Sequence, residues 1–127
     1  MDALCLLAAG ALAARLPIAA FALEWTHSVE KTRWVERYRV EASALRLVEA
    51  SVEGSGAGME PAPGAMFGDG RWTWWPDRAL PDLALRHSPF VPPYTLCTEQ
   101  GCAPLTALVG PAAEDRVVLL RPCPAPR

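Results

Sequence analysis

Apolar and polar residues alternate with a period of two along three consecutive segments, at 21–28, 33–41 and 45–53. A period of two places successive side chains on opposite faces of a β-strand. A polar break at 29–32 and the short Ala42-Ser43-Ala44 link separate the segments, and both are compatible with tight turns. The pattern therefore predicts a three-stranded antiparallel meander.

The segment from Ala3 to Leu23 is almost wholly apolar and long enough on paper to cross a bilayer. Arg15 and Pro17 disfavour a membrane span, and the acidic start Met1-Asp2 disfavours a signal peptide. We expect instead a β-hairpin, with residues 4–7 as one strand, a turn around Gly10 and a second strand from Pro17 towards Ser28. An export signal or membrane anchor is the alternative.

Further strands are predicted in the second half of the chain. Gly68-Asp69-Gly70 marks a hairpin turn with a return strand at 71–75, and an apolar alternation at 83–87 predicts another strand. With 127 residues the chain is one domain in size. We predict an all-β fold with little or no helix, a single antiparallel meander that closes into a small sandwich or barrel. Residues 1–110 would form the domain, and 111–127 a final edge strand followed by a proline-rich tail.

The charge pattern argues against nucleic acid as a partner. The net charge is −2, and the positive charges are one Lys and eleven Arg scattered along the sequence. Proteins that follow a phosphate backbone normally carry a continuous basic strip, which is missing from this sequence.

Ionisable residues interrupt the apolar face of the predicted meander. A turn centred on Glu30-Lys31 places His27 opposite Trp34, and a turn one residue later places it opposite Glu36. Matching the apolar faces of the second and third strands puts Glu36 opposite Glu49, although a one-residue slip would turn Glu49 to the other face. One histidine and two carboxylates are thus expected to converge.

Three interpretations of this group stay open. It could be a structural pair that fixes strand register, a ligand-contacting or acid–base pair, or a metal site. No metal is predicted, because only one histidine is placed there. Ser28 is not a nucleophile served by His27, since adjacent residues on a strand point to opposite faces.

The glycine-rich segment GSGAGMEP at 54–61 leads into prolines rather than a helix. It therefore matches neither a dinucleotide-binding motif nor a phosphate-binding loop, and it lacks the glycines of a nucleophile elbow. Its backbone N–H groups could form an anion-binding nest beside the Ser55 hydroxyl and Glu60. A tight crossover at the sheet edge is the alternative.

Tryptophan and histidine supply further candidates. Trp72 and Trp74 share a strand face, so the five tryptophans of the chain could form a stacking platform for a sugar or aromatic ligand, or could belong to the core. His87 ends an apolar alternation and is a candidate second metal ligand, although nothing local places it beside His27.

The sequence holds four cysteines, and Cys97 and Cys102 flank a four-residue turn. These two residues can lie opposite each other across a hairpin, so we expect a disulfide. A zinc site would need a second ligand pair. The even count favours an oxidising compartment, while the weak export signal favours the cytoplasm. The compartment stays open, with the cytoplasm, close to the inner membrane, slightly favoured over the periplasm.

Several of these motifs carry a family resemblance. WTHSVEK at 25–31, Trp34 with Glu36, Leu47 with Glu49, GSGAGMEP and the late Leu96-Cys97 resemble the bacterial domain-of-unknown-function family eighteen-fifty, over residues 4–109. The resemblance implies a small β-rich protein encoded beside TAXI-type TRAP transporter components, namely the solute receptor and the permease. The candidate ligand-binding residues are His27, Ser28, Glu30, Glu36, Glu49, Ser55, Gly56, Gly58 and Glu60.

Three functions are compatible with these observations. The favoured one is a non-enzymatic accessory protein of a TRAP-type uptake system, without a cofactor, that binds a small anionic solute or a component of the transporter. The second is a small hydrolase or metal-dependent enzyme that uses His27 with Glu36, Glu49 or Ser55. The third is a structural or interaction domain in which the ionisable pair only stabilises the fold.

Overall fold

The structure, a computed structural model, describes residues 2–26, 31–54 and 62–124. Within these residues the chain forms twelve strands and one helix. They are, in chain order, β1 (Asp2–Ala8), β2 (Ala11–Leu16), β3 (Ala20–Thr26), β4 (Arg33–Val40), β5 (Leu45–Glu53), β6 (Met66–Gly68), β7 (Arg71–Trp74), β8 (Arg78–Leu80), β9 (Leu83–His87), β10 (Thr95–Thr98), β11 (Gly101–Pro104), α1 (Leu105–Val109) and β12 (Arg116–Pro124). The predicted all-β fold with little helix is confirmed. Nothing helical in this part of the chain has the length and apolar character needed to cross a membrane.

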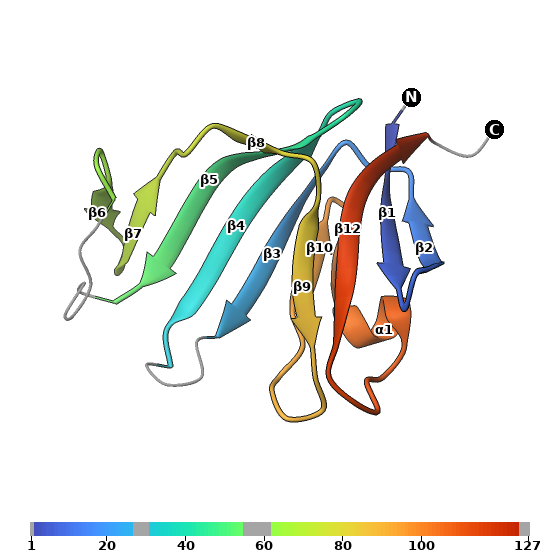
Figure 1. The fold of residues 1–127 in the computed structure, drawn as a ribbon. Helices are drawn as coiled ribbons and strands as arrows, with labels where there is room; N and C mark the ends of the chain where they lie inside the picture. The colour runs from blue at the N-terminus through green and yellow to red at the C-terminus, as the bar shows by residue number, and fades with distance from the viewer. Residues whose placement is uncertain (1, 27–30, 55–61, 125–127) are drawn as a thin grey trace.

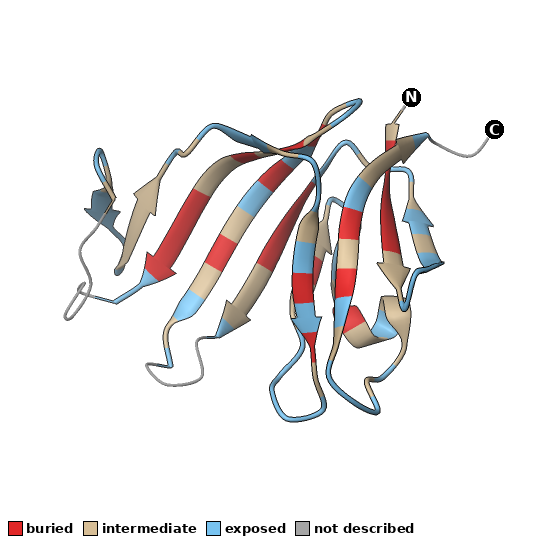
Figure 2. Cartoon of the chain, viewed as in Figure 1, coloured by how far each residue is buried: buried red, intermediate tan, exposed pale blue. Residues whose placement is uncertain are grey.

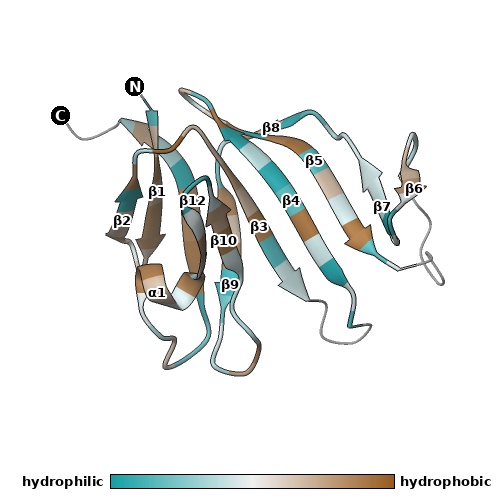
Figure 3. Cartoon of the chain, turned by 180° about the vertical axis from the view of Figure 1, so that it is seen from behind, coloured by the Kyte–Doolittle hydropathy of each residue, from teal (hydrophilic) through white to brown (hydrophobic). Residues whose placement is uncertain are grey.

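The strands form two antiparallel sheets (Figure 1). The smaller sheet has the order β2-β1-β12-β9, and the larger has the order β11-β10-β3-β4-β5-β7-β6, with β8 paired to the first part of β5. Views from the front and from behind both place β6 and β7 at the opposite end of the molecule from β1 and β2 (Figures 1 and 3). The two sheets therefore form a sandwich that is open towards β6 and β7.

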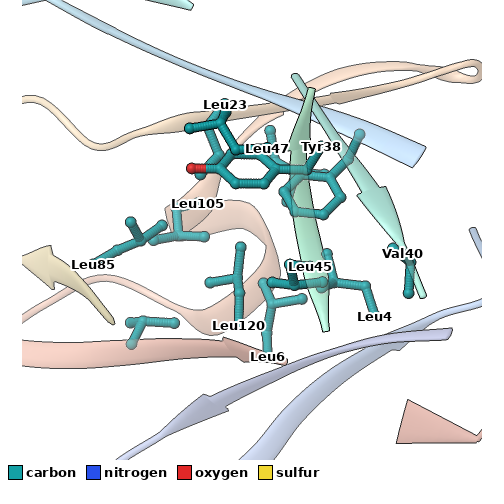
Figure 4. Packing of buried hydrophobic residues seen from close by; sticks show 13 residues of the cluster. Leu4, Leu6, Leu23, Tyr38, Val40, Leu45, Leu47, Leu85, Leu105 and Leu120 are labelled. Carbon is teal, nitrogen blue, oxygen red and sulfur yellow. The ribbon is translucent and has the colours of Figure 1, made fainter. Parts of the chain in front are cut away.

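The hydrophobic core lies between the smaller sheet and one end of the larger sheet. The smaller sheet and α1 contribute Leu4, Leu6, Leu85, Leu105, Val118 and Leu120, and the larger sheet contributes Phe21, Leu23, Tyr38, Val40, Leu45, Leu47 and Leu96. Figure 4 shows Leu4 and Leu6 beside Leu45, so side chains from the two sheets meet directly. Burial of each large apolar side chain contributes about 1.5–3 kcal/mol, which makes this cluster the main source of stability.

The N-terminal hairpin is tighter than the sequence indicated. After β1 the chain turns at Ala9 and Gly10, which both have positive φ, and returns as β2. This is the two-residue turn that matches the twist of paired strands. The strand expected from Pro17 towards Ser28 is present as β3, but its expected pairing with residues 4–7 was wrong, because β2 is the partner of β1 and β3 joins the larger sheet. Alanine, which dominates residues 11–14, is depleted in strands and so concealed β2.

The predicted meander is present as β3, β4 and β5, with an irregularity that decides which residues share a face. Tyr38 pairs with Leu47, but its neighbour Arg37 pairs with Glu49, so that Val48 is an extra residue in β5. Such a β-bulge reverses the faces of all residues beyond it relative to an unbroken strand. Ala50 and Val52 consequently share the inner face of the larger sheet with Leu45 and Leu47, while Glu49 points outwards.

The C-terminal strand corrects a second expectation. β12 lies between β1 and β9, and is not an edge strand. It pairs with β1 along the whole of that strand, including Pro122 opposite Leu4. Prolines are usually confined to sheet edges and tails because they lack an N–H donor, which explains the wrong prediction. Residues 116–124 are therefore part of the sandwich.

Both disulfides join strand neighbours. Cys5 on β1 is bonded to Cys123 on β12, and Cys97 on β10 is bonded to Cys102 on β11. The first bond links the two ends of the chain across 118 residues, whereas the second closes a hairpin with a separation of 5 residues. All four cysteines of the sequence are thus paired.

Candidate functional site

The structure describes only part of the candidate site. His27, Ser28, Glu30, Ser55, Gly56, Gly58 and Glu60 lie outside the described residues. Glu36 and Glu49 are described and occupy β4 and β5. The arrangement of the candidate site therefore has to be judged from these two carboxylates and their surroundings.

Glu36 and Glu49 do not converge. Glu36 pairs with Ala50 and faces inwards, whereas Glu49 pairs with Arg37 on the outer face of the sheet. The Arg37 Nε atom donates to Glu49 Oε2 over 3.0 Å. The expected opposition of the two carboxylates was wrong because the bulge at Val48 shifts the register by one residue. An acid–base mechanism that combines Glu36 with Glu49 is therefore excluded by their positions.

The expected register of the first turn was also wrong. Trp34 pairs with Trp25, and Glu36 pairs with Leu23. The positions opposite Trp34 and Glu36, where His27 was expected, are thus occupied by apolar residues of β3. His27 itself lies outside the described residues.

Glu36 lies at the boundary between the core and the open end of the sandwich. The Tyr38 hydroxyl donates a hydrogen bond of 2.8 Å to Glu36 Oε1. Burial raises the pKa of the Glu36 carboxyl above its ordinary value, and the Tyr38 hydrogen bond and the charge of Arg78 oppose this change. Burial and then the nearby Glu36 charge raise the pKa of both Tyr38 and Tyr94, so both phenols stay protonated at neutral pH.

Aromatic side chains continue along the inner face beyond Glu36. The ring centroids of Tyr94 and Trp25 are 5.3 Å apart, those of Trp25 and Trp34 are 6.1 Å apart with nearly parallel planes, and those of Trp34 and Trp74 are 6.1 Å apart edge to face. Trp72 follows on the same face, opposite Val52. We call Tyr94, Trp25, Trp34, Trp72 and Trp74 the aromatic row.

The aromatic row is only half-buried. All five side chains have intermediate exposure, and Trp34, Trp72 and Trp74 are not part of the buried core cluster. Figure 2 shows β7 in tan, whereas β4 and β5 carry red positions that include the end of β5 beside β7, where Ala50 and Val52 are buried. The indole Nε1 atoms of Trp34 and Trp72 are enclosed, yet have no hydrogen-bond partner within the described part of the chain. The row therefore combines apolar rings with unused donors.

The outer face of the larger sheet has a different chemistry. Ion pairs cross its strands, with Arg33 bound to Glu24 and Arg37 bound to Glu49, while Arg46 binds both Glu41 and Asp77. The ribbon in Figure 3 accordingly alternates between hydrophilic and hydrophobic positions along β4, whereas β1 is hydrophobic along most of its length. Exposed ion pairs of this kind are typical of a solvated sheet face.

The cysteine and histidine candidates have structural partners. Glu24, Cys97 and Cys102 bring three ligand-type atoms within 4.8 Å of one another, but both sulfurs belong to the disulfide. His87 is buried, and its Nε2 atom is 2.9 Å from the carbonyl oxygen of Gly110. Neither group has the free ligands that a metal ion needs in this state.

Comparison with known proteins places the chain in a family. The family model described as Domain of unknown function (DUF1850) matches residues 21–105. The chain belongs to this family. The match begins in β3 and ends at the start of α1, so it includes every strand of the larger sheet and leaves out β1, β2 and β12. No curated protein and no solved structure matches.

Some residues of the inner face could not be recognised from the sequence. Arg78 reaches this face because β8 pairs with β5, with Arg78 opposite Leu47. β8 is three residues long and carries no clear alternation, so no pattern indicated its partner. Tyr94 precedes β10 and meets Trp25 only because β10 pairs with β3. Trp25 and Trp34 each fall on the apolar face predicted for their strand. This placement was the available sequence signal for a shared aromatic face.

Proposed function

We propose that the chain is a non-enzymatic accessory domain of a TRAP-type solute-uptake system, and that it binds a small carboxylate-bearing solute or a component of the transporter. The observation that carries the proposal is the open end of the larger sheet, where the half-buried aromatic row borders Glu36 and Arg78. Faces that combine aromatic rings with a few placed polar groups are typical of binding sites. The link to TRAP systems rests on the family resemblance.

The positions of the acidic residues favour binding over catalysis. With Glu49 engaged by Arg37 on the outer face, a hydrolase that used His27 with both Glu36 and Glu49 would lack its second carboxylate. Its hydroxyl partner Tyr38 is a buried member of the core. Glu36 is thus held in place by a structural residue, which suits a fixed charge in a binding site.

The disulfides support an extracytoplasmic location for this function. Disulfides persist in the periplasm and are rare in the cytosol. The chain has all four cysteines in two bonds, one of which joins its first and last strands. We therefore infer an extracytoplasmic domain, on the side of the membrane where an uptake system captures its solute.

Capture from native membranes tests this proposal. Tagged protein, cross-linked in intact cells, should recover the TRAP permease or solute receptor, identified by mass spectrometry. Trp74→Ala should reduce this recovery, whereas Trp75→Ala, which removes an exposed neighbour outside the aromatic row, should not.

In a second experiment, organic acids should raise the melting temperature of the pure protein if a solute is bound. Absence of both transporter components and of any thermal shift would refute the proposal.

A further inference from the structure

Glu36 and Arg78 place opposite charges on one face of the sheet, where the charge of Arg78 lowers the pKa of Glu36 but the described side chains form no ion pair with each other. Arg78 of β8 pairs with Leu47 of β5, and Leu47 in turn pairs with Tyr38 of β4. Tyr38 is two residues after Glu36 on β4, so the two residues share a face. The side chains of Glu36 and Arg78 therefore belong to the inner face, one row and two strands apart. Within the described residues Glu36 accepts from Tyr38, and Arg78 is exposed and takes part in no ion pair. By contrast, Arg33, Arg37, Arg39 and Arg46 on the outer sheet face all bind carboxylates.

The aromatic row lies directly next to this pair of charges. Trp34 is two residues before Glu36 on the same face, and Trp74 pairs with Ala50, which also pairs with Glu36. An ammonium group is attracted both to a carboxylate and to the face of an indole ring. A carboxylate is matched by a guanidinium, which can bind it through two parallel hydrogen bonds. The face thus offers separate positions for a cation, an anion and an apolar group.

We propose that this face binds a free amino acid with an apolar or aromatic side chain. The ammonium group lies against Glu36, the carboxylate is directed towards Arg78, and the side chain packs on Trp25 and Trp34. This proposal rests on the proposed solute-binding function and narrows its ligand. A simple organic acid would meet the negative charge of Glu36, and a simple amine would leave Arg78 unused, so only the zwitterion uses both charges.

Calorimetric titration of the oxidised full chain tests the assignment with four probes. These are L-phenylalanine, L-leucine, phenethylamine, which lacks the carboxylate, and 3-phenylpropionate, which lacks the ammonium group. The two amino acids should bind, and each truncated probe should bind about tenfold to a hundredfold more weakly, the usual loss for one charge-assisted hydrogen bond. Binding of 3-phenylpropionate with higher affinity than L-phenylalanine would overturn the amino-acid assignment.

Matched variants separate the two charges. Glu36→Gln and Arg78→Gln should each weaken L-phenylalanine binding by about tenfold or more. The controls Glu49→Gln and Arg37→Gln alter the ion pair on the outer face and should leave binding unchanged. Far-ultraviolet circular dichroism and thiol titration establish that each variant is folded and oxidised. Equal loss in the inner-face and outer-face variants would overturn the assignment.

The outcomes distinguish this inference from the broader proposal. If organic acids bind and Glu36→Gln strengthens their binding, the solute-binding function holds and the amino-acid assignment is wrong. If none of the four probes binds to folded protein, the amino-acid site is excluded, while recovery of a transporter component would still support the accessory role.

Discussion

The inner face of the larger sheet has a covered end and an open end, and β3, β4 and β5 build both. At the covered end, Phe21, Tyr38 and Leu45 lie against the smaller sheet in the buried core. At the open end, β3 and β4 present Trp25 and Trp34, which are half-buried, while Ala50 and Val52 of β5 stay buried. Glu36 stands between the two ends, held by the Tyr38 hydroxyl. Leucine and tyrosine thus give way to tryptophan and glutamate beyond the residues that pack in the buried core cluster.

This difference separates stability from binding within one strand. A leucine at the covered end contributes only apolar area, and water never reaches it. A tryptophan at the open end offers a large, half-buried ring, and such rings are favoured where a surface contacts another molecule. We therefore expect substitutions at the covered end to unfold the protein, and substitutions at the open end to change what it binds.

Loss of the disulfide that closes the smaller sheet should have the largest effect on stability. Replacing Cys5 and Cys123 together by alanine should lower the free energy of unfolding by about 4 kcal/mol, because this bond closes a loop that spans nearly the whole chain. Replacing Cys97 and Cys102 together should cost about 2 kcal/mol, since the closed hairpin is short. Urea unfolding followed by circular dichroism measures both values, and the reverse order would contradict the importance of the smaller sheet.

A cavity in the covered end should be the next most damaging change. Leu120 on β12 is fully buried in the core cluster. Leu120→Ala should lower the free energy of unfolding by about 2–5 kcal/mol, the usual cost of truncating a buried leucine. Val117→Ala on the same strand is the control: its side chain is 53% exposed, and its loss should change stability by less than about 0.5 kcal/mol. A similar cost for both variants in urea unfolding would show that β12 does not seal the core.

The strands themselves could be predicted largely from local patterns. Alternation at 21–28, 33–41 and 45–53 identified the meander, and Gly68-Asp69-Gly70 identified a hairpin whose turn residues Asp69 and Gly70 have positive φ. These signals depend on neighbouring residues, so they survive without knowledge of the fold. β2 was missed because its residues are mostly alanine, whose presence in a strand depends on the partner β1.

The candidate site was harder to predict because it depends on register. One extra residue, Val48, moves Glu49 from the face of Glu36 to the opposite face, and no feature of the sequence marks that bulge. Arg78 joins the inner face through the pairing of β8 with β5, which is a long-range choice. The aromatic character of the face was visible in the tryptophan alternation, but its partial burial depends on where the smaller sheet ends.

Glu36→Gln should reveal the cost of holding a carboxylate at the boundary between the two ends. Burial raises the pKa of Glu36 above its ordinary value of 4.5, so the folded state binds a proton more tightly than the unfolded state. The contribution of Glu36 to the free energy of unfolding should therefore fall as the pH rises from about 4.5 through the raised pKa, and should be constant above it. The glutamine variant should lack this decline and be more stable than the wild type at neutral pH. Urea unfolding at a series of pH values checks this, and parallel curves for the two proteins would contradict it.

The outer-face pair of Arg37 and Glu49 should give the smallest effect, and it tests the register on which the comparison depends. Both side chains are partly solvent-exposed, at 59% and 34%, and such pairs contribute about 0.2–1 kcal/mol. A double-mutant cycle with Arg37→Ala and Glu49→Ala should give a coupling energy in this range that weakens as salt is added. The matched cycle with Glu36→Ala and Glu49→Ala should give no coupling, because the bulge places these carboxylates on opposite faces. Coupling in the second cycle but not in the first would mean that β5 runs without its bulge, which would return Glu49 to the inner face beside Glu36.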